Sequence, residues 1–328
     1  MNKTKLIFVL LTSLALGACS NDDEQVTQQP KSYPLTIEVT ENPLIPDGEE
    51  GGTATRAAIT DNSTLTGFNM SYVYGSEASS DPITATKGSE GKWSSTGLWP
   101  GTSDEVTWYA YTSGTFNRTD DAKKDPYINF TVDENAATQK DLLVATASGT
   151  YSGTGGNLSF TFDHACAAVR FYVKKSTNLN DYTVSVSSIV LKYVVKQGKY
   201  FYGTGAWTLT DNRSNYTLLS SAKTLGSGSG DYQLLNGSEN DSYLFLIPQT
   251  LTPWDHTTAI ASATTQTYLE VTCNIIGATN YSGTAYIPFT ISTSEGNQTL
   301  QKGKKYDVKI NIGKNSLYNN SGSLIINP

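Results

Sequence analysis

Charge, histidine and long apolar runs are scarce in this chain. Of its 328 residues only 16% are charged and two are histidine, so an imidazole-based metal centre or catalytic site has few candidates. The net charge is -7 and the pI about 4.9, which leaves no basic surface to neutralise phosphates and excludes nucleic acid as an expected partner. After the N-terminal signal described below, no stretch is apolar enough to span a bilayer.

Cysteine is too rare for a disulfide scaffold. The chain has three, and Cys19 stands apart near the N-terminus. Cys166 and Cys273 each fall in an apolar, strand-like stretch, which favours two buried free thiols. An oxidising compartment would also allow them to pair, and the sequence leaves that alternative open.

The first residues form an export signal. Two lysines precede an apolar run over residues 6–16, which is shorter than the about 20 residues of a membrane span. Leu16-Gly17-Ala18-Cys19 follows and resembles the lipobox of bacterial lipoproteins, in which the Cys thiol is acylated and the chain is cut just before it. We therefore expect a signal peptide of residues 1–18 and a lipid on Cys19, since two acyl chains give stable anchoring. The alternative is ordinary signal cleavage near Ala18.

What the chain has in abundance is the composition of a secreted β-protein. Tyr reaches 20 and Gly 28, with many Thr and Ser, and these residues suit pleated, half-buried strands and the turns between them. Apolar and polar side chains alternate along several segments, which predicts strands with one buried face and an all-β fold class. The clearest of these segments are residues 68–74, 106–111, 269–275, 285–291 and 306–312.

Turn residues divide the predicted strands. Residues 280–283 predict a hairpin between the neighbouring strands, and Gln197-Gly198 predicts a second one. A Gly-rich break at residues 152–156 indicates a domain junction. Just beyond it the alternation changes phase across residues 163–168, which indicates a bulge or a turn.

A strand near the N-terminus is followed by a segment that cannot bury a core. Tyr33, Leu35, Ile37 and Val39 share one face of this strand. Residues 40–56 are rich in Pro, Gly and acidic residues, so we expect an exposed, protease-sensitive loop. Burial of Leu35, Ile37 and Val39 would contribute roughly 5–9 kcal/mol, counted as an upper bound. A strand that can detach is thus followed by a loop that can be cut.

No catalytic constellation is evident, and neither enzyme activity nor a cofactor is expected. We expect His164 to be a core or edge residue and His256 to lie at the surface. The acidic groups around Asp120-Asp121 and Asp125 and around Asp211 lack the spacing of an EF-hand loop and are expected to be solvated. Most of four tryptophans are expected to fill the cores rather than stack on sugars: Trp93, Trp99, Trp207 and Trp254.

Several short motifs recur in an order that points to a known family. They are Thr55-Arg56-Ala57, Leu65-Thr66-Gly67-Phe68, Leu98-Trp99-Pro100, residues 106–111, residues 141–145, residues 160–165, Leu246-Ile247-Pro248-Gln249 and residues 302–306. In this order the chain resembles the fimbrillin-like proteins of Bacteroidetes, the subunits of type V pili. The resemblance implies two transthyretin-like β-sandwich domains in tandem. We place them at residues 57–156 and 157–314, after a propeptide (19–56) and before a tail (315–328).

The resemblance also implies a route of assembly. In that family a lipidated precursor reaches the outer membrane, an Arg- or Lys-specific protease removes the N-terminal segment, and the vacated groove accepts a strand of another subunit. Arg56 is the only basic residue between Lys31 and Lys87, so we expect the cut between Arg56 and Ala57. The expected product is an extracellular fimbrium that supports adhesion. Its expected partners are other pilin subunits and a ligand on a host or bacterial surface.

The predicted donor strand lies in the tail, because residues 305–312 complete their own sandwich. The candidate donor residues are Leu317, Leu324, Ile325 and Ile326. Leu324 and Ile326 share a face, while Ile325 points the other way. The alternative is a tail folded back on its own domain.

Two other functions stay open at this point. One is a monomeric surface lipoprotein that binds glycans, and the other is a glycoside hydrolase, which needs two carboxylates facing one cleft. A glycan-binding lipoprotein must keep its lipid, whereas the pilus subunit loses every residue before Ala57.

Overall fold

Strands dominate the computed structural model, which describes residues 33–48, 65–74, 77–79, 81–101, 104–118, 125–226, 232–235 and 243–325. Helical turns are short in these ranges: α1 (Tyr151–Thr154) and two 3-10 turns, Thr177–Leu179 and Ile260–Ser262. The predicted all-β class is therefore confirmed. No helix among these residues is long and apolar enough to cross a membrane.

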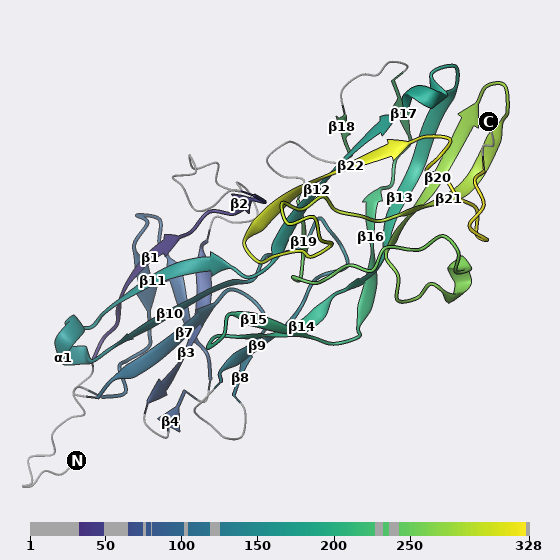
Figure 1. The fold of residues 1–328 in the computed structure, drawn as a ribbon. Helices are drawn as coiled ribbons and strands as arrows, with labels where there is room; N and C mark the ends of the chain where they lie inside the picture. Colours follow the sequence, from purple (N-terminus) through teal and green to yellow (C-terminus); the bar gives the residue numbers. More distant parts are fainter. Residues whose placement is uncertain are drawn as a thin grey trace, which may run out of the picture. The chain divides into compact units, whose positions relative to one another are not determined.

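The first sheet curls around a core of its own (Figure 1). Its strands are, in order across the sheet, β1 (Thr36–Glu41), β11 (Asn157–His164), β10 (Leu143–Gly149), β7 (Val106–Tyr111), β3 (Gly67–Tyr74), β5 (Ile83–Lys87) and β6 (Trp93–Ser95), and β4 (Glu77–Ala78) pairs with β3. Met70 and Trp108 are fully buried in this core. A bridge between Pro34 and Leu98 joins the segment just before β1 to the segment after β6, so the two edges of the sheet meet.

Two further sheets enclose a second, larger core and form a β-sandwich. One contains β18 (Gln233–Leu234), β12 (Ala167–Lys175), β22 (Lys304–Ile312) and β2 (Ile45–Pro46), with β19 (Leu244–Leu246) on β12. The other contains β16 (Arg213–Leu219), β13 (Thr183–Val195), β20 (Tyr268–Ile276) and β21 (Tyr281–Pro288), with β17 (Lys223–Leu225) on β13. Inward residues of both, such as Val173 and Val271, belong to the same buried cluster.

A fourth sheet covers the outer face of β7. It contains β15 (Ala206–Leu209), β14 (Gln197–Phe201), β9 (Tyr127–Thr131) and β8 (Thr115–Asn117). The Tyr109 ring lies 5.0 Å from the ring of Tyr202 and 5.7 Å from that of Phe116. The Tyr202 hydroxyl donates to the Ala110 carbonyl at 2.8 Å. Because β7 is covered on both faces, its outward side includes the aromatic residues Tyr109 and Tyr111 as well as Thr107.

The Gly-rich break at residues 152–156 lies within the first sheet and is not a domain junction. Residues 151–154 form α1, a single helical turn that connects β10 to β11. β11 then pairs with β1 and with β10, so the boundary predicted at residue 156 falls one strand too early. Glycine suits a tight turn as well as a linker, and the sequence alone did not separate the two. The chain enters the sandwich after His164, where the predicted change of phase marks a change of sheet.

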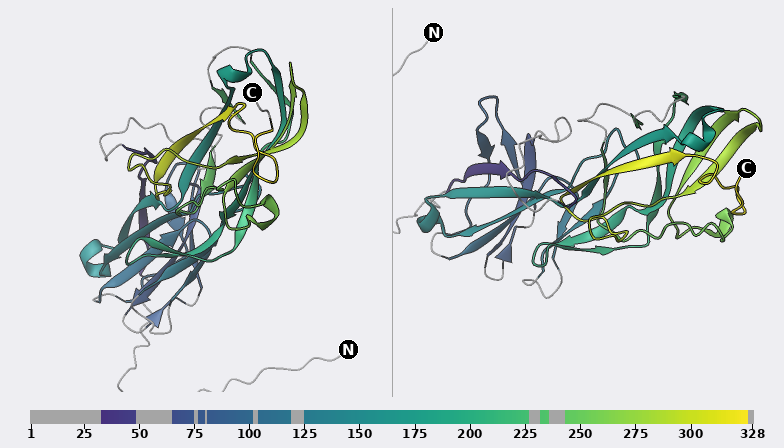
Figure 2. Two further views of the ribbon diagram at one scale, coloured as in Figure 1. Left: turned by 45° about the vertical axis from the view of Figure 1, so that its right-hand side comes forward. Right: turned by 45° about the horizontal axis from the view of Figure 1, so that its top comes forward.

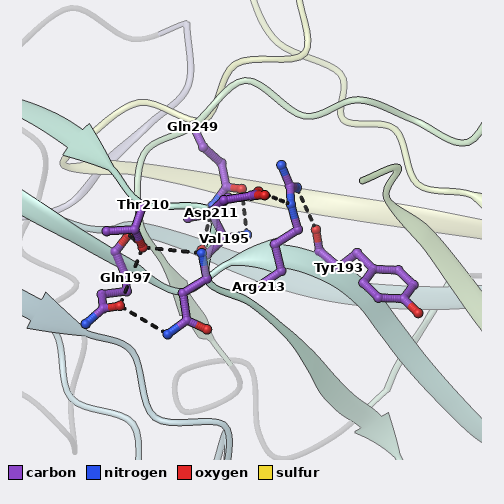
Figure 3. A network of polar contacts seen from close by, with 8 residues as sticks. Tyr193, Val195, Gln197, Thr210, Asp211, Arg213 and Gln249 are labelled. Atoms are coloured by element: carbon purple, nitrogen blue, oxygen red, sulfur yellow. Dashed lines mark hydrogen bonds and ion pairs between the residues drawn. The ribbon is translucent and has the colours of Figure 1, made fainter. Parts of the chain in front are cut away.

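The hairpin predicted at Gln197-Gly198 is wrong, because β13 and β14 belong to different sheets. β13 is bulged near Tyr193, whose φ is 59°, and ends at Val195. Gln249 satisfies the backbone at that end: it accepts from the Val195 N–H and donates to the Val195 carbonyl, both at 3.0 Å (Figure 3). It also donates to the Ile247 carbonyl at 2.9 Å. The hairpin predicted at residues 280–283 is confirmed, between β20 and β21.

The expectations for cysteine and tryptophan are largely met. Cys166 and Cys273 are buried and free, and burial raises the pKa of Cys166 and raises the pKa of Cys273 to about 11. Trp99 and Trp254 are each 2% exposed. The other two tryptophans of that prediction are half-buried against the cores: Trp93 and Trp207.

Candidate functional site

The N-terminal segment, residues 33–48, is the candidate functional element. Its alternation places Tyr33, Leu35, Ile37 and Val39 against the core of the first sheet, and Ile37 is 6% exposed. The residues between them, such as Thr36, are exposed. The four side chains predicted to share a face therefore do so, and they face the core.

β1 supplies most of the pairing of β11. The two strands run parallel, in register from Thr36 beside Asn157 to Glu41 beside Phe162, and they lie side by side in Figures 1 and 2. On its other edge β11 pairs with β10 only through its last two residues, Asp163 and His164. Without β1, the backbone of residues 157–162 would lose its strand partner.

Polar contacts fix the register along the outer side of β1. The hydroxyls of Thr40 and Thr161 lie 2.9 Å apart across the pair. The Ser159 hydroxyl donates to the Glu38 carboxylate at 3.2 Å. The first residue of β1, Thr36, donates its N–H to the Gly156 carbonyl at 2.9 Å.

The start of the segment is held by Trp99. Its backbone N–H donates to the Tyr33 carbonyl at 2.8 Å, and its indole N–H donates to the Gly156 carbonyl at 3.3 Å. The Tyr33 ring packs 4.9 Å from the ring of Tyr151 in α1. The indole is buried, so this corner is an integral part of the first core.

The segment continues into the second core, which corrects the exposed loop expected from residue 40 onward. Leu44 is 3% exposed and belongs to the larger core. Ile45 and Asp47 donate their N–H groups to the carbonyls of Gly303 and Lys305 at 2.9 and 3.1 Å, as β2 runs parallel to β22. Two apolar residues between two prolines were too short a signal to predict this strand.

The junction between the two halves of the segment carries a polar cluster. The Nδ1 atom of His164 lies 2.5 Å from Asp141 Oδ2, and its Nε2 atom lies 3.7 Å from Glu41 Oε1. His164 and Asp141 are buried, as expected for a satisfied core histidine, while the Glu41 side chain is 30% exposed. Neither carboxylate was predicted to meet His164, because the three residues are far apart in the chain.

The described part of the tail folds back on its own chain. Leu317 is fully buried in the larger core, and Ile325 packs against it from outside. Tyr318 exchanges two backbone hydrogen bonds with Tyr286 of β21, at 2.9 and 3.0 Å, and bridges to Leu324. This is the folded-back arrangement weighed as the alternative to a free donor strand.

Four predicted site residues lie outside the described part of the chain: Cys19, Arg56, Ala57 and Ile326. Asp120 and Asp121 lie there as well. His256 is exposed, as expected, and its ring stacks on Tyr318 at 4.8 Å. Among the described residues no cluster of His, Cys, Asp and Glu has the arrangement of a metal site.

A family model described as fimbrillin-like matches residues 50–328. The chain belongs to the fimbrillin-like family. This confirms the resemblance found in the sequence, and it places the N-terminal segment of this fimbrillin-like chain just before the matched region.

A solved fimbrial protein shares the fold of this fimbrillin-like chain. A fimbrial protein from Bacteroides vulgatus has a TM-score of 0.56 at 17% identity and covers 85% of this chain and 95% of its own. A candidate cell adhesion protein from Bacteroides uniformis has a TM-score of 0.46 at 13% identity and covers 88% of this chain and 96% of its own. At such identities the likeness concerns the fold alone. A comparison with curated proteins finds no match.

Proposed function

We propose that this fimbrillin-like chain is a structural subunit of a cell-surface fimbrium, assembled when its N-terminal segment is removed and a strand of another subunit takes its place. The observation that carries the proposal is the dependence of β11 on β1 for its pairing over residues 157–162. Removal would free this backbone edge and expose the core around Ile37. A freed edge beside an apolar groove is a template for strand addition.

Sequence features outside the described residues supply the steps before assembly. Acylation of Cys19 would hold the precursor in the outer membrane. A cut between Arg56 and Ala57 would then separate the N-terminal segment and its lipid from the body of the subunit. The segment could leave after that cut because only noncovalent contacts with the two cores retain it.

The incoming strand is proposed to come from the tail of a neighbouring subunit. In this chain the tail is folded back, so donation requires its release. Leu317 anchors it in the core, whereas the part beyond is held mainly through Tyr318 and Tyr286 and through a bond from the Ile260 N–H to the Asn320 carbonyl. Release of the part beyond Leu317 would break these bonds and the packing of Tyr318 and Ile325, and would leave Leu317 buried.

The role proposed for the mature subunit is structural and not enzymatic. It lies at the cell surface within the fimbrium and supports adhesion to a host or bacterial surface. The fimbrillin-like family match and the fold shared with a fimbrial protein support this assignment.

The experiment is to shear fimbriae from the producing bacterium and sequence the N-terminus of this subunit. We expect it to begin at Ala57. Arg56→Ala should leave the lipidated precursor in the outer membrane and out of the fimbriae, while Lys31→Ala, which removes a charge from the same propeptide, should assemble normally. Subunits that begin at Cys19 in sheared fimbriae would contradict the proposal and favour a lipid-retaining protein that binds glycans.

A further inference from the structure

The buried imidazole of His164 lies between two carboxylates of different origin. Asp141 belongs to the body of the subunit, and its second oxygen accepts from the Cys166 N–H at 3.3 Å. Glu41 is the last residue of β1 and belongs to the N-terminal segment. Removal of that segment would leave Asp141 in place and expose the Nε2 side of the ring.

Glu41 continues the inward alternation of the segment. Leu35, Ile37 and Val39 face the core, and Glu41 is the next residue of the same parity. Its carboxylate reaches the imidazole, while Glu38 lies on the other face with the Ser159 hydroxyl. The groove therefore accommodates three apolar side chains followed by one acidic side chain at alternate positions.

The charges around His164 favour its protonated form. Burial opposes the charge, but the hydrogen bond to Asp141 and the negative charges of Asp141 and Glu41 raise the pKa of His164 above its usual value, with help from the Asn42 backbone. Burial raises the pKa of Glu41, and the positive charges of His164 and Lys87 act against that rise. Asp163, beside the cluster, is occupied by the Asn42 amide at 2.7 Å.

We propose that the groove emptied by the N-terminal segment selects an incoming strand that carries an Asp or Glu at the position of Glu41, where its carboxylate meets His164. The inference rests on the proposed function. The occupant is a strand of another fimbrillin-like subunit with apolar residues at the three preceding inward positions. Residues 315–328 of this chain contain neither Asp nor Glu, so its own tail is a poor match and the neighbour on this side is a different chain.

Peptide exchange tests this directly with an unchanged protein body. A specific protease site placed within residues 49–64 allows the chain to be nicked after folding, and labelled peptides of residues 33–48 then compete for the groove. We expect Glu41→Gln in the peptide to weaken competition about fivefold near pH 6, a loss in the range of a charge-assisted contact at a partly exposed site. Glu38→Gln removes the same charge from the same strand and should change the competition by the peptide less than about twofold.

The pH dependence follows from the direction of the shift. The bound carboxylate raises the pKa of His164, so strand binding takes up a proton. The preference for Glu41 is therefore largest below the pKa of His164 in the empty groove and above the pKa of Glu41, and it is lost as the pH rises through the pKa of His164 in the filled groove. A peptide of residues 315–328, which has no acidic residue, should compete more weakly than the natural peptide in that pH range.

A second measurement uses the intact chain. The sequence has two histidines, so imidazole NMR signals can be assigned with a His256→Gln variant. Glu41→Gln should lower the pKa of His164, and Glu38→Gln should leave it unchanged. Exchange without preference between the peptides, or equal effects of both substitutions on the imidazole, would overturn this inference alone. If no peptide, including the natural one, enters the nicked protein, the exchange mechanism falls as well.

Discussion

At the scale of single residues, Gly156 determines how closely the chain can pass the start of β1. Its φ is 85°, and its carbonyl accepts from both the Thr36 N–H and the Trp99 indole. A Cβ atom on Gly156 would lie 3.0 Å from the Pro34 carbonyl oxygen and 2.9 Å from the Tyr151 ring. The neighbouring Gly155 has a φ of 64° but open space around the same position.

This pair of glycines gives a matched prediction. Gly155→Ala should cost about 1–2 kcal/mol of unfolding free energy, the strain of a left-handed backbone. Gly156→Ala should cost at least about 1 kcal/mol more, because the methyl group also displaces Pro34 or Tyr151. Urea unfolding of both variants measures the difference. Equal costs would show that the contact with the N-terminal segment contributes nothing.

At the scale of elements, the end of β13 depends on a side chain where a strand would otherwise pair. Gln249 is 6% exposed, and its side chain takes the place of a neighbouring strand. It makes three hydrogen bonds to the backbone, of which the two to Val195 are drawn in Figure 3. The chain can therefore leave one sheet after Val195 and enter another at Gln197 without leaving buried backbone N–H and C=O groups unpaired.

Substitution of Gln249 should therefore lower the free energy of unfolding substantially. Gln249→Ala leaves a buried N–H and a buried C=O of Val195 without their partner, and we expect a loss of about 2–4 kcal/mol in the free energy of unfolding. Gln197→Ala removes a side-chain amide from the same junction. The Gln197 side chain is half-buried and accepts a hydrogen bond from the exposed Asn212, so its loss should cost below about 1 kcal/mol of unfolding free energy. Thermal or urea unfolding distinguishes them, and a small effect at Gln249 would mean that water replaces its contacts.

The elements also show how far the sequence alone could lead. The alternation of apolar and polar side chains is a local signal. It predicted both the strands and their buried faces over residues 33–39 and 306–312. Pairing is not local: nothing in residues 33–39 indicates that β11, more than a hundred residues later, is the parallel neighbour. The Gln197 hairpin failed because a turn signal cannot reveal that the next strand joins another sheet.

The same difference between local pattern and long-range pairing holds for the candidate site. The segment with Ile37 could be predicted from its pattern, as could the buried state of His164. The contact of His164 with Asp141 and Glu41 could not, because it depends on how three distant segments meet. Leu44 was missed because its neighbouring prolines and acidic residues are typical of a loop.

At the scale of the whole molecule, the N-terminal segment is the one described element that joins both cores from outside the family-matched region. β1 closes the first sheet, and β2 pairs with β22 of the sandwich. Loss of this segment would therefore free the edge of β11 in the first sheet and the edge of β22 in the sandwich. In the proposed assembly this segment must leave before the subunit can be incorporated.

A reversible covalent lock between β1 and β11 tests that requirement most directly. Thr40 and Thr161 are register partners with hydroxyls 2.9 Å apart, so Thr40→Cys with Thr161→Cys should form a disulfide that retains the segment after the cut at Arg56. In the producing bacterium we predict that this double variant is cleaved but absent from sheared fimbriae, that a reductant restores its incorporation, and that Thr40→Cys alone assembles normally. Fimbriae that contain the locked subunit, with the disulfide intact, would contradict the account.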